Sequence, residues 1–289
     1  NWWLRISTPA GQSATQIKTK VGGALGEYFE STASVSGTGL ISAGDLMQGI
    51  EVNGHSLGGY LATAFTRLLG SQAHVSHTST YNSAGFAPGS ETVFTNLQNL
   101  IGPSYGLGRF PNTSEQSNYF AAHGLNLTTN AFWFSQQGKR VELFNENDTS
   151  QVGNHFMYKL TDALALGVAL EKLDSTFTTA KFNALLEAGS NKTEASLEGV
   201  LDALRRMLIN PNSASTPVGD VSGSAPSRVN YHANLDAFTK TPTFTSLAGK
   251  LTLTLATQSL ATTAKSDFCA FLSLNALSPF VISTSDAGV

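Results

Sequence analysis

Residues 54–59 read Gly-His-Ser-Leu-Gly-Gly and place one nucleophilic side chain, Ser56, among the small neighbours that a sharp strand-to-helix turn requires. Residues 47–52 before this stretch alternate apolar and polar side chains, which predicts a strand with one buried face. Residues 57–69 after it predict a helix that packs on a sheet through an apolar stripe. The stripe consists of Leu57, Leu61, Phe65 and Leu68. Such a turn would present the Ser56 hydroxyl for attack on an ester.

The neighbours of Ser56 have chemical roles of their own. A side chain at Gly54 or Gly58 would collide with the adjoining segment, because strand and helix approach closely at this kind of turn. The amide of Leu57 lies at the predicted helix N-terminus, where the helix dipole favours a developing oxyanion. A glycine-rich turn with a helix-capping serine is the alternative interpretation. The flanking strand and helix patterns favour the nucleophile.

A serine hydroxyl needs a histidine to accept its proton and a carboxylate to orient that histidine. The chain has six histidines. The α/β-hydrolase order is serine, acid, histidine along the chain, which leaves His155 and His232 as the candidates. His155 is preferred, because it lies where a loop meets the apolar helix predicted over residues 156–173.

The orienting acid is expected in the turn that follows a later strand. Residues 140–144 predict that strand, and Asp148 comes shortly after it, seven residues before His155. Asp148 is therefore the predicted acid, and Glu146 is the second choice. Asp162 is a further rival, although its place within the predicted helix favours a structural role.

Alternating strand and helix patterns predict an α/β fold with a mostly parallel central sheet. The chain has 289 residues with 41% hydrophobic content, which can bury a substantial core, and we expect one domain over residues 1–289. Residues 87–138 read as an insertion of the kind that forms a lid, and residues 156–289 read as more helical. The remaining expected elements are a strand over residues 1–6, a helix over 13–29, a strand over 74–82, and short strands over 252–255 and 280–283.

Composition narrows the classes of partner. Net charge is −3 and 13% of residues are charged, which disfavours nucleic acid and anionic membrane surfaces as electrostatic partners. The single cysteine, Cys269, excludes a disulfide framework within the chain and lacks the companions that zinc requires. No signal peptide or transmembrane run is visible, and a start at Asn1 suggests an excised domain or fragment. Serine hydrolysis itself requires no metal or cofactor.

Several segments resemble one family. Residues 54–62 resemble the nucleophile elbow of bacterial lipases, and residues 80–86, 153–166 and 267–272 are similar to segments of lipase-like domains of large bacterial RTX proteins. The resemblance implies an α/β-hydrolase fold, lipid-ester substrates and an extracellular, secreted protein. It also implies that the catalytic histidine is the one before the long apolar helix, which is His155. The Arg-Gly-Thr strand end of such lipases is not seen here, so the second oxyanion donor stays unassigned.

These observations lead to a functional hypothesis, a serine carboxylester hydrolase, most simply a lipase that cleaves acylglycerols through an acyl-enzyme. Ser56 is the nucleophile, His155 the base, Asp148 the orienting acid and the Leu57 amide one oxyanion donor. Two alternatives stay open. A phospholipase A1 would use the same triad, and an inactive hydrolase-fold module could serve a larger secreted protein as a binding domain.

Overall fold

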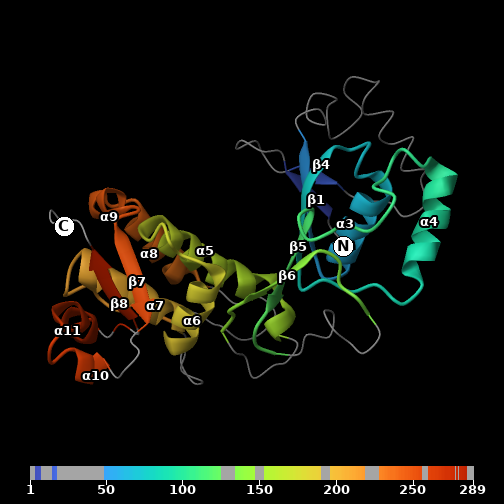
Figure 1. The fold of residues 1–289 in the computed structure, drawn as a ribbon. Coiled ribbons are helices and arrows are strands. Elements are labelled where there is room, and N and C mark those ends of the chain that lie inside the picture. The colour runs from blue at the N-terminus through green and yellow to red at the C-terminus, as the bar shows by residue number, and fades with distance from the viewer. Residues whose placement is uncertain are drawn as a thin grey trace. The chain divides into compact units, whose positions relative to one another are not determined.

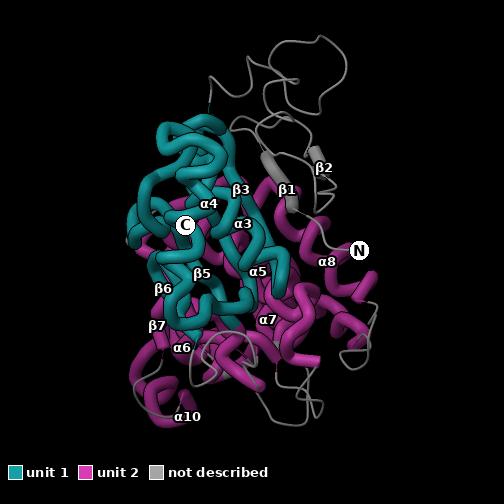
Figure 2. The backbone as a smooth tube through the Cα atoms, turned by 90° about the vertical axis from the view of Figure 1, so that its right-hand side faces the viewer, with its two compact units in different colours: residues 1–120, 126–141 teal, residues 121–125, 142–289 magenta. Residues whose placement is uncertain are grey.

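The computed structural model describes residues 4–7, 15–17, 49–124, 134–146, 153–189, 196–218, 228–255, 260–276, 278 and 280–284. The chain divides into two compact units, residues 1–120 with 126–141 and residues 121–125 with 142–289 (Figure 2). The predicted single domain stays a prediction. Within the described ranges, no helix combines the length and the hydropathy that crossing a bilayer requires.

A mostly parallel sheet with flanking helices gives the chain its α/β character (Figure 1). The strand order is β2-β1-β3-β4-β5-β6, with β3, β4 and β5 parallel and β1 antiparallel to both of its neighbours. The strands are β1 (Leu4–Ser7), β2 (Thr15–Ile17), β3 (Ile50–His55), β4 (Val75–Tyr81), β5 (Gln116–Ala121) and β6 (Lys139–Leu143). The boundary between the two units falls at the ends of β5 and β6.

A strand before Ser56 and a helix after it form as predicted, but β3 begins at Ile50 and continues to His55, beyond the predicted end of the strand at residue 52. In β3, Ile50 and Val52 are fully buried while Glu51 is exposed, so the alternation of the sequence is the alternation of the strand. Helix α3 (Leu57–Leu69) has the predicted bounds. The predicted apolar stripe is only half right, because Phe65 and Leu68 are buried but Leu57 is 38% exposed.

Near the N-terminus the predicted strand is confirmed, and the predicted helix is wrong at the three of its residues that the structure describes. β1 confirms a strand close to the predicted residues 1–6. Residues 15–17, expected within a helix over 13–29, form β2 and pair antiparallel with β1. Two of these three residues, Thr15 and Ile17, are β-branched and suit an edge strand. Residues 18–29 lie outside the described part of the chain.

The stretch over residues 87–138 contributes to the sheet. It contains α4 (Ser90–Ile101) and β5, which pairs in parallel with β4. The sheet therefore continues through residues that were expected to interrupt it. Residues 125–133 of this stretch lie outside the described residues, and a lid stays a prediction.

The second unit consists mainly of helices (Figure 1). Its buried core includes leucines of α5 and α7. Its helices are η1 (Gly153–His155), α5 (Met157–Leu173), α6 (Thr179–Gly189), α7 (Ser196–Leu208), α8 (Val229–Thr239), α9 (Pro242–Leu247), α10 (Leu260–Thr263) and α11 (Phe268–Asn275). The two short strands predicted near the C-terminus are confirmed. They are β7 (Leu251–Leu255) and β8 (Phe280–Thr284), which pair antiparallel.

Asp174, at the C-terminal end of α5, joins three elements of this unit. One of its carboxylate oxygens accepts hydrogen bonds from the amide and hydroxyl of Thr176, at 2.8 and 2.7 Å. The other accepts from Lys181 Nζ and from the Leu253 amide of β7, both at 3.0 Å. Burial opposes the charge of Asp174, but these hydrogen bonds outweigh burial and lower its pKa below the ordinary value.

We expect Asp174→Asn to destabilise the second unit in a pH-dependent way. A lowered native pKa means that Asp174 contributes stability above its unfolded pKa, about 3.9, and that this contribution is lost as pH falls through the native value. The variant should lose roughly 1–3 kcal/mol in the free energy of unfolding at neutral pH and converge with the wild type in acid. Urea unfolding across acidic and neutral pH measures both. Asp236→Asn is the control, because Asp236 pairs with Lys240 on the surface and should contribute little to stability. If Asp174→Asn were as stable as the wild type at neutral pH, the stabilising role of the Asp174 carboxylate would be contradicted.

Candidate active site

Ser56 occupies the junction between the last residue of β3 and the first residue of α3. Its backbone angles are φ 58° and ψ −125°, outside the regions that non-glycine residues ordinarily adopt. Such a conformation costs about 1–3 kcal/mol and persists only where surrounding contacts impose it. The Ser56 side chain makes no hydrogen bond that caps α3, which argues against the capping interpretation.

Backbone hydrogen bonds hold Ser56 in this conformation. Its N–H donates to the carbonyl of Tyr81 at the end of β4, at 3.0 Å. Its carbonyl accepts from the amide of Gly59 at 3.0 Å and from the amide of Ala84 at 3.1 Å. The next strand, the loop after that strand and the first turn of α3 therefore all fix the serine.

Two glycines allow the close approach of these segments. A Cβ on Gly54 would overlap the carbonyl oxygen of Gly58, as the sequence predicted. A Cβ on Gly59 would lie 2.5 Å from the Cβ of Ser83, in the loop after β4. Sequence reasoning gave Gly59 no steric role, because its neighbour is distant in the chain.

The carboxyl ends of β3, β4 and β5 meet at the same edge of the sheet as Ser56. Asn82, directly after β4, is fully buried at φ 43°, and its N–H donates to the carbonyl of Tyr119 at 2.8 Å. The rings of Tyr81 and Tyr119 are stacked with centroids 5.3 Å apart. Ligand sites of open α/β sheets lie at this edge, so Ser56 is placed where such chemistry occurs.

Residues 135 and 136, near the C-terminal end of the stretch over residues 87–138, are hydrogen-bonded to the loop that follows β4 and holds Ser56. Phe86 and Ser135 exchange backbone hydrogen bonds of 2.8 and 2.9 Å, and Gln136 Nε2 donates to the Ser83 carbonyl at 2.6 Å. Phe134 is 47% exposed and borders Gly85. An apolar side chain is thus held next to the loop that fixes Ser56.

The amide of Leu57 is the first of α3. The first amides of a helix have no acceptor within that helix and lie at the positive end of its dipole. This position suits one donor of an oxyanion hole, as predicted. A second donor stays unassigned, since residues 8–14 after β1 lie outside the described residues.

His155 is the last residue of η1 and lies directly before α5, where the sequence predicted it. It is partly buried and belongs to the second unit, whereas Ser56 belongs to the first. Asp148 lies outside the described residues. The pairing of His155 with Ser56 and Asp148 therefore stays a prediction.

Two buried asparagines, Asn145 and Asn154, flank Asp148 in the sequence and hydrogen-bond to each other. Asn145 follows β6 and Asn154 lies in η1, and Asn145 Nδ2 donates to Asn154 Oδ1 at 2.9 Å. Both side chains are buried, and Asn145 also hydrogen-bonds the amide and carbonyl of His123 at 2.8 and 3.2 Å. In the sequence, Asp148 comes three residues after Asn145, and His155 directly follows Asn154. Sequence reasoning did not predict the hydrogen bond between these asparagines. The signal available in the sequence was that Asn145 follows the strand over residues 140–144 and Asn154 precedes His155.

Glu146, the second choice of acid, belongs to a buried ion cluster. Its carboxylate accepts from the Leu197 amide at 2.9 Å and from the guanidinium of Arg228, which also binds Glu198. Burial opposes the charge of Arg228, but the carboxylates of Glu146 and Glu198 outweigh it and raise the pKa of this arginine. A carboxylate engaged in this way has a structural role.

The two remaining rivals, Asp162 and His232, pair with each other. Asp162 Oδ1 in α5 and His232 Nε2 in α8 are 2.7 Å apart. Asp162 is 5% exposed, and its other oxygen lies 3.5 Å from Arg228 Nη1. The structure thus brings the two rivals together as a histidine–carboxylate pair, whose acid also contacts the arginine of the ion cluster.

The described ranges contain no group of three or more histidine, cysteine or acidic side chains placed to hold a metal ion.

Comparison with protein-family models, with curated proteins and with solved structures found no match for this chain. The class that the structure establishes is an α/β protein with a strained serine at the carboxyl edge of its sheet.

Gly54→Ala should disrupt the turn around Ser56, because the added methyl group overlaps the Gly58 carbonyl oxygen. We expect a loss of about 1–3 kcal/mol or more in the free energy of unfolding, measured by denaturant titration. Gly199→Ala is the matched control, since an added Cβ there meets no neighbouring atom and alanine favours the helix of α7. Unchanged stability of Gly54→Ala would contradict the close approach.

Proposed function

We propose that this protein is a serine carboxylester hydrolase of the α/β-hydrolase type, a lipase that cleaves acylglycerol esters. The observation that carries the proposal is the backbone of Ser56, at φ 58° and ψ −125°, between a parallel strand and the helix that follows it. A strained serine at this junction is the defining feature of a nucleophile elbow. The segments that resemble bacterial lipases support the same reaction.

The reaction follows from the roles of four groups. Ser56 attacks the ester carbonyl while His155 accepts its proton, and the Leu57 amide stabilises the oxyanion. The tetrahedral intermediate collapses to an acyl-enzyme, and the protonated His155 gives the proton to the departing alcohol. Water, deprotonated by His155, then releases the acid and restores Ser56. Asp148 orients the imidazole and stabilises its charged form.

Two observations support Asp148 and His155 over the rival residues. In the sequence, Asp148 lies between Asn145 and Asn154, whose side chains hydrogen-bond to each other, and His155 directly follows Asn154. Glu146 and Asp162 are both bound to Arg228, whose positive charge offsets the negative charge that would stabilise an imidazolium. His232 depends on Asp162 for its carboxylate partner.

Apolar ester substrates are part of the proposal. The exposed ring of Phe134 lies beside Gly85, in the loop after β4 that holds Ser56, and could contact the acyl chain of a substrate. The resemblance to lipase-like domains of RTX proteins adds acylglycerol as the substrate class and an extracellular location. Assays with triacylglycerol and with phosphatidylcholine separate the lipase from a phospholipase A1 acting through the same triad.

Substitution of the three proposed catalytic residues tests the function. Ser56→Ala should abolish hydrolysis of p-nitrophenyl butyrate and labelling by a fluorophosphonate probe. His155→Ala and Asp148→Asn should each lower kcat by roughly 10⁴-fold. His232→Ala serves as the control and should leave kcat near the wild-type value. Full activity of Ser56→Ala would refute the hydrolase, and sensitivity of His232 rather than His155 would move the base to the Asp162 pair.

Asn145→Ala should remove the hydrogen bond between Asn145 and Asn154, which flank Asp148 in the sequence, without changing any of the reacting atoms. A displacement of about 1 Å can cost up to ~10²-fold, so we expect kcat to fall roughly 10- to 100-fold with little change in KM. Steady-state kinetics separates the two constants. The exposed Asn210, changed to Ala, is the control for loss of a local asparagine hydrogen bond. Equal kcat in Asn145→Ala and the wild type would remove the positioning role of this residue.

A further inference from the structure

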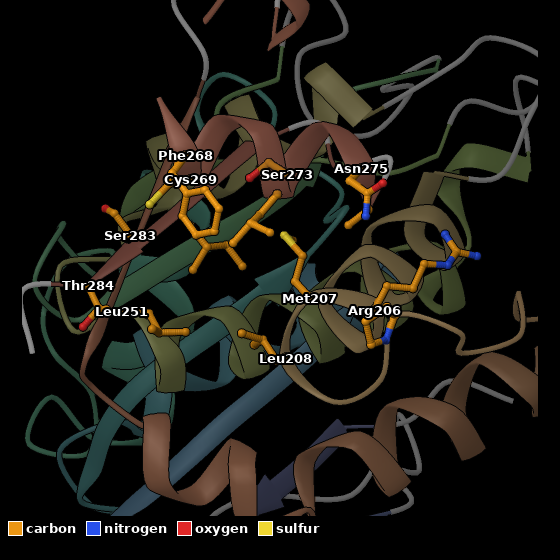
Figure 3. Close-up of a pocket in the computed structure, with 14 residues that line it drawn as sticks. Arg206, Met207, Leu208, Leu251, Phe268, Cys269, Ser273, Asn275, Ser283 and Thr284 are labelled. Carbon is orange, nitrogen blue, oxygen red and sulfur yellow. The ribbon is translucent and has the colours of Figure 1, made fainter. Parts of the chain in front are cut away.

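The second unit contains a cavity of about 410 Å³ that the proposed hydrolysis does not use. It lies between α7, α11 and the two-stranded sheet of β7 and β8 (Figure 3). Its walls are mainly apolar, with Met207, Leu251, Phe268, Leu272 and Ile282 among the lining residues. This volume is within the range of about 300–1,000 Å³ that small-molecule sites occupy.

The polar side chains of the cavity are hydrogen-bond donors, and one carries a positive charge. Arg206 from α7 and Asn275 from α11 lie on the same side of the cavity in Figure 3. Arg206 Nη2 donates to Ser215 Oγ outside the lining at 2.8 Å, and the other N–H groups of this guanidinium make no hydrogen bond to the described residues. None of the fourteen described lining residues is acidic, so the charge of Arg206 is not offset within the lining. A guanidinium and an amide beside apolar walls suit an anionic oxygen joined to a hydrocarbon body.

Ser273 gives an independent sign of a ligand. Its side chain lines the cavity from α11 and is 1% exposed, and its hydroxyl has no hydrogen-bond partner among the described residues. A buried hydroxyl without a partner is unfavourable, and native proteins rarely retain one unless a ligand or water satisfies it. An oxygen of a bound molecule would provide the missing partner.

We propose that this cavity binds a medium-chain monocarboxylic acid. The hydrocarbon chain packs against Met207, Leu251 and Leu272, and the carboxylate takes its charge partner from Arg206. The Ser273 hydroxyl gains its hydrogen-bond partner from the ligand. All residues that line the cavity belong to the second unit, whereas Ser56 belongs to the first, and the proposal does not depend on ester hydrolysis.

Decanoate is the probe, and the Ser56→Ala protein is the background, so that ester chemistry plays no part in the result. Cys269, the single cysteine of the chain, lines the same cavity and reports its occupancy. We expect saturable binding of one decanoate per chain by calorimetry, with slower alkylation of Cys269 by iodoacetamide as the site fills. Decan-1-ol, which lacks the carboxylate, should bind at least about tenfold more weakly. Absence of saturable binding, or an unchanged alkylation rate, would overturn the proposal.

Two variants test the contacts. Arg206→Gln should weaken decanoate binding about tenfold while leaving decan-1-ol unaffected, because only the carboxylate uses the charge. Lys265→Gln removes an exposed positive charge outside the cavity and is the matched control. Ser273→Ala should weaken decanoate binding and raise the melting temperature of the ligand-free protein, since the unpartnered hydroxyl is gone. Equal decanoate affinity in Arg206→Gln and Lys265→Gln would refute the carboxylate site.

Discussion

The first unit depends on one strained residue and on the hydrogen bonds that hold it. The backbone of Ser56 would relax to an ordinary conformation unless the end of β4, the loop after it and the first turn of α3 all opposed this. The glycine at position 54 lets α3 begin directly against β3, and Gly59 lets the loop at Ser83 close over the helix. A serine that merely capped a helix would need none of these contacts, since capping uses unstrained backbone.

In the second unit, a cluster of buried charged side chains connects separate segments of the chain. Arg228 connects the segment after β6, through Glu146, with α7, through Glu198. Burying such charges is costly, but removing one partner leaves the others unpaired and typically costs about 3–5 kcal/mol. The cluster therefore fixes where β6 leads into the following segment. The hydrogen bond between Asn145 and Asn154 fixes the same segment at its other end.

The strand, turn and helix around Ser56 could be predicted because each depends on local pattern. β3 alternates, α3 repeats at three or four residues, and glycines mark the turn between them. β5 could not be predicted in this way, because its buried positions include Gln116 and Asn118. Asn118 accepts a hydrogen bond from Thr80 of β4, 38 residues away, and another from Gln116 of its own strand. A partner distant in sequence thus makes a polar strand suitable for the sheet interior.

The buried face of α3 was misjudged for the same reason. Arg67 is fully buried, although an arginine in a helical pattern ordinarily faces solvent. Its guanidinium binds Gln98, Glu91 and Thr95 of α4, at sequence separations of 24 to 31 residues. The apolar pattern placed Leu57 on the buried face and gave no sign that Arg67 is buried. Polar partners brought by the fold decide which face of the helix is covered.

The same principle ranks the candidate acids of the proposed triad. Spacing alone left Asp148, Glu146 and Asp162 open, because it does not reveal which carboxylates have a cationic partner. Glu146 and Asp162 both contact Arg228, and a carboxylate that already neutralises a guanidinium has less negative charge to stabilise an imidazolium. Glu146 and Asp162, whose surroundings the structure describes, therefore meet the electrostatic requirement of the reaction poorly. This argument counts against two of the three candidates and leaves Asp148, the acid that spacing ranks first, as the proposed partner of His155.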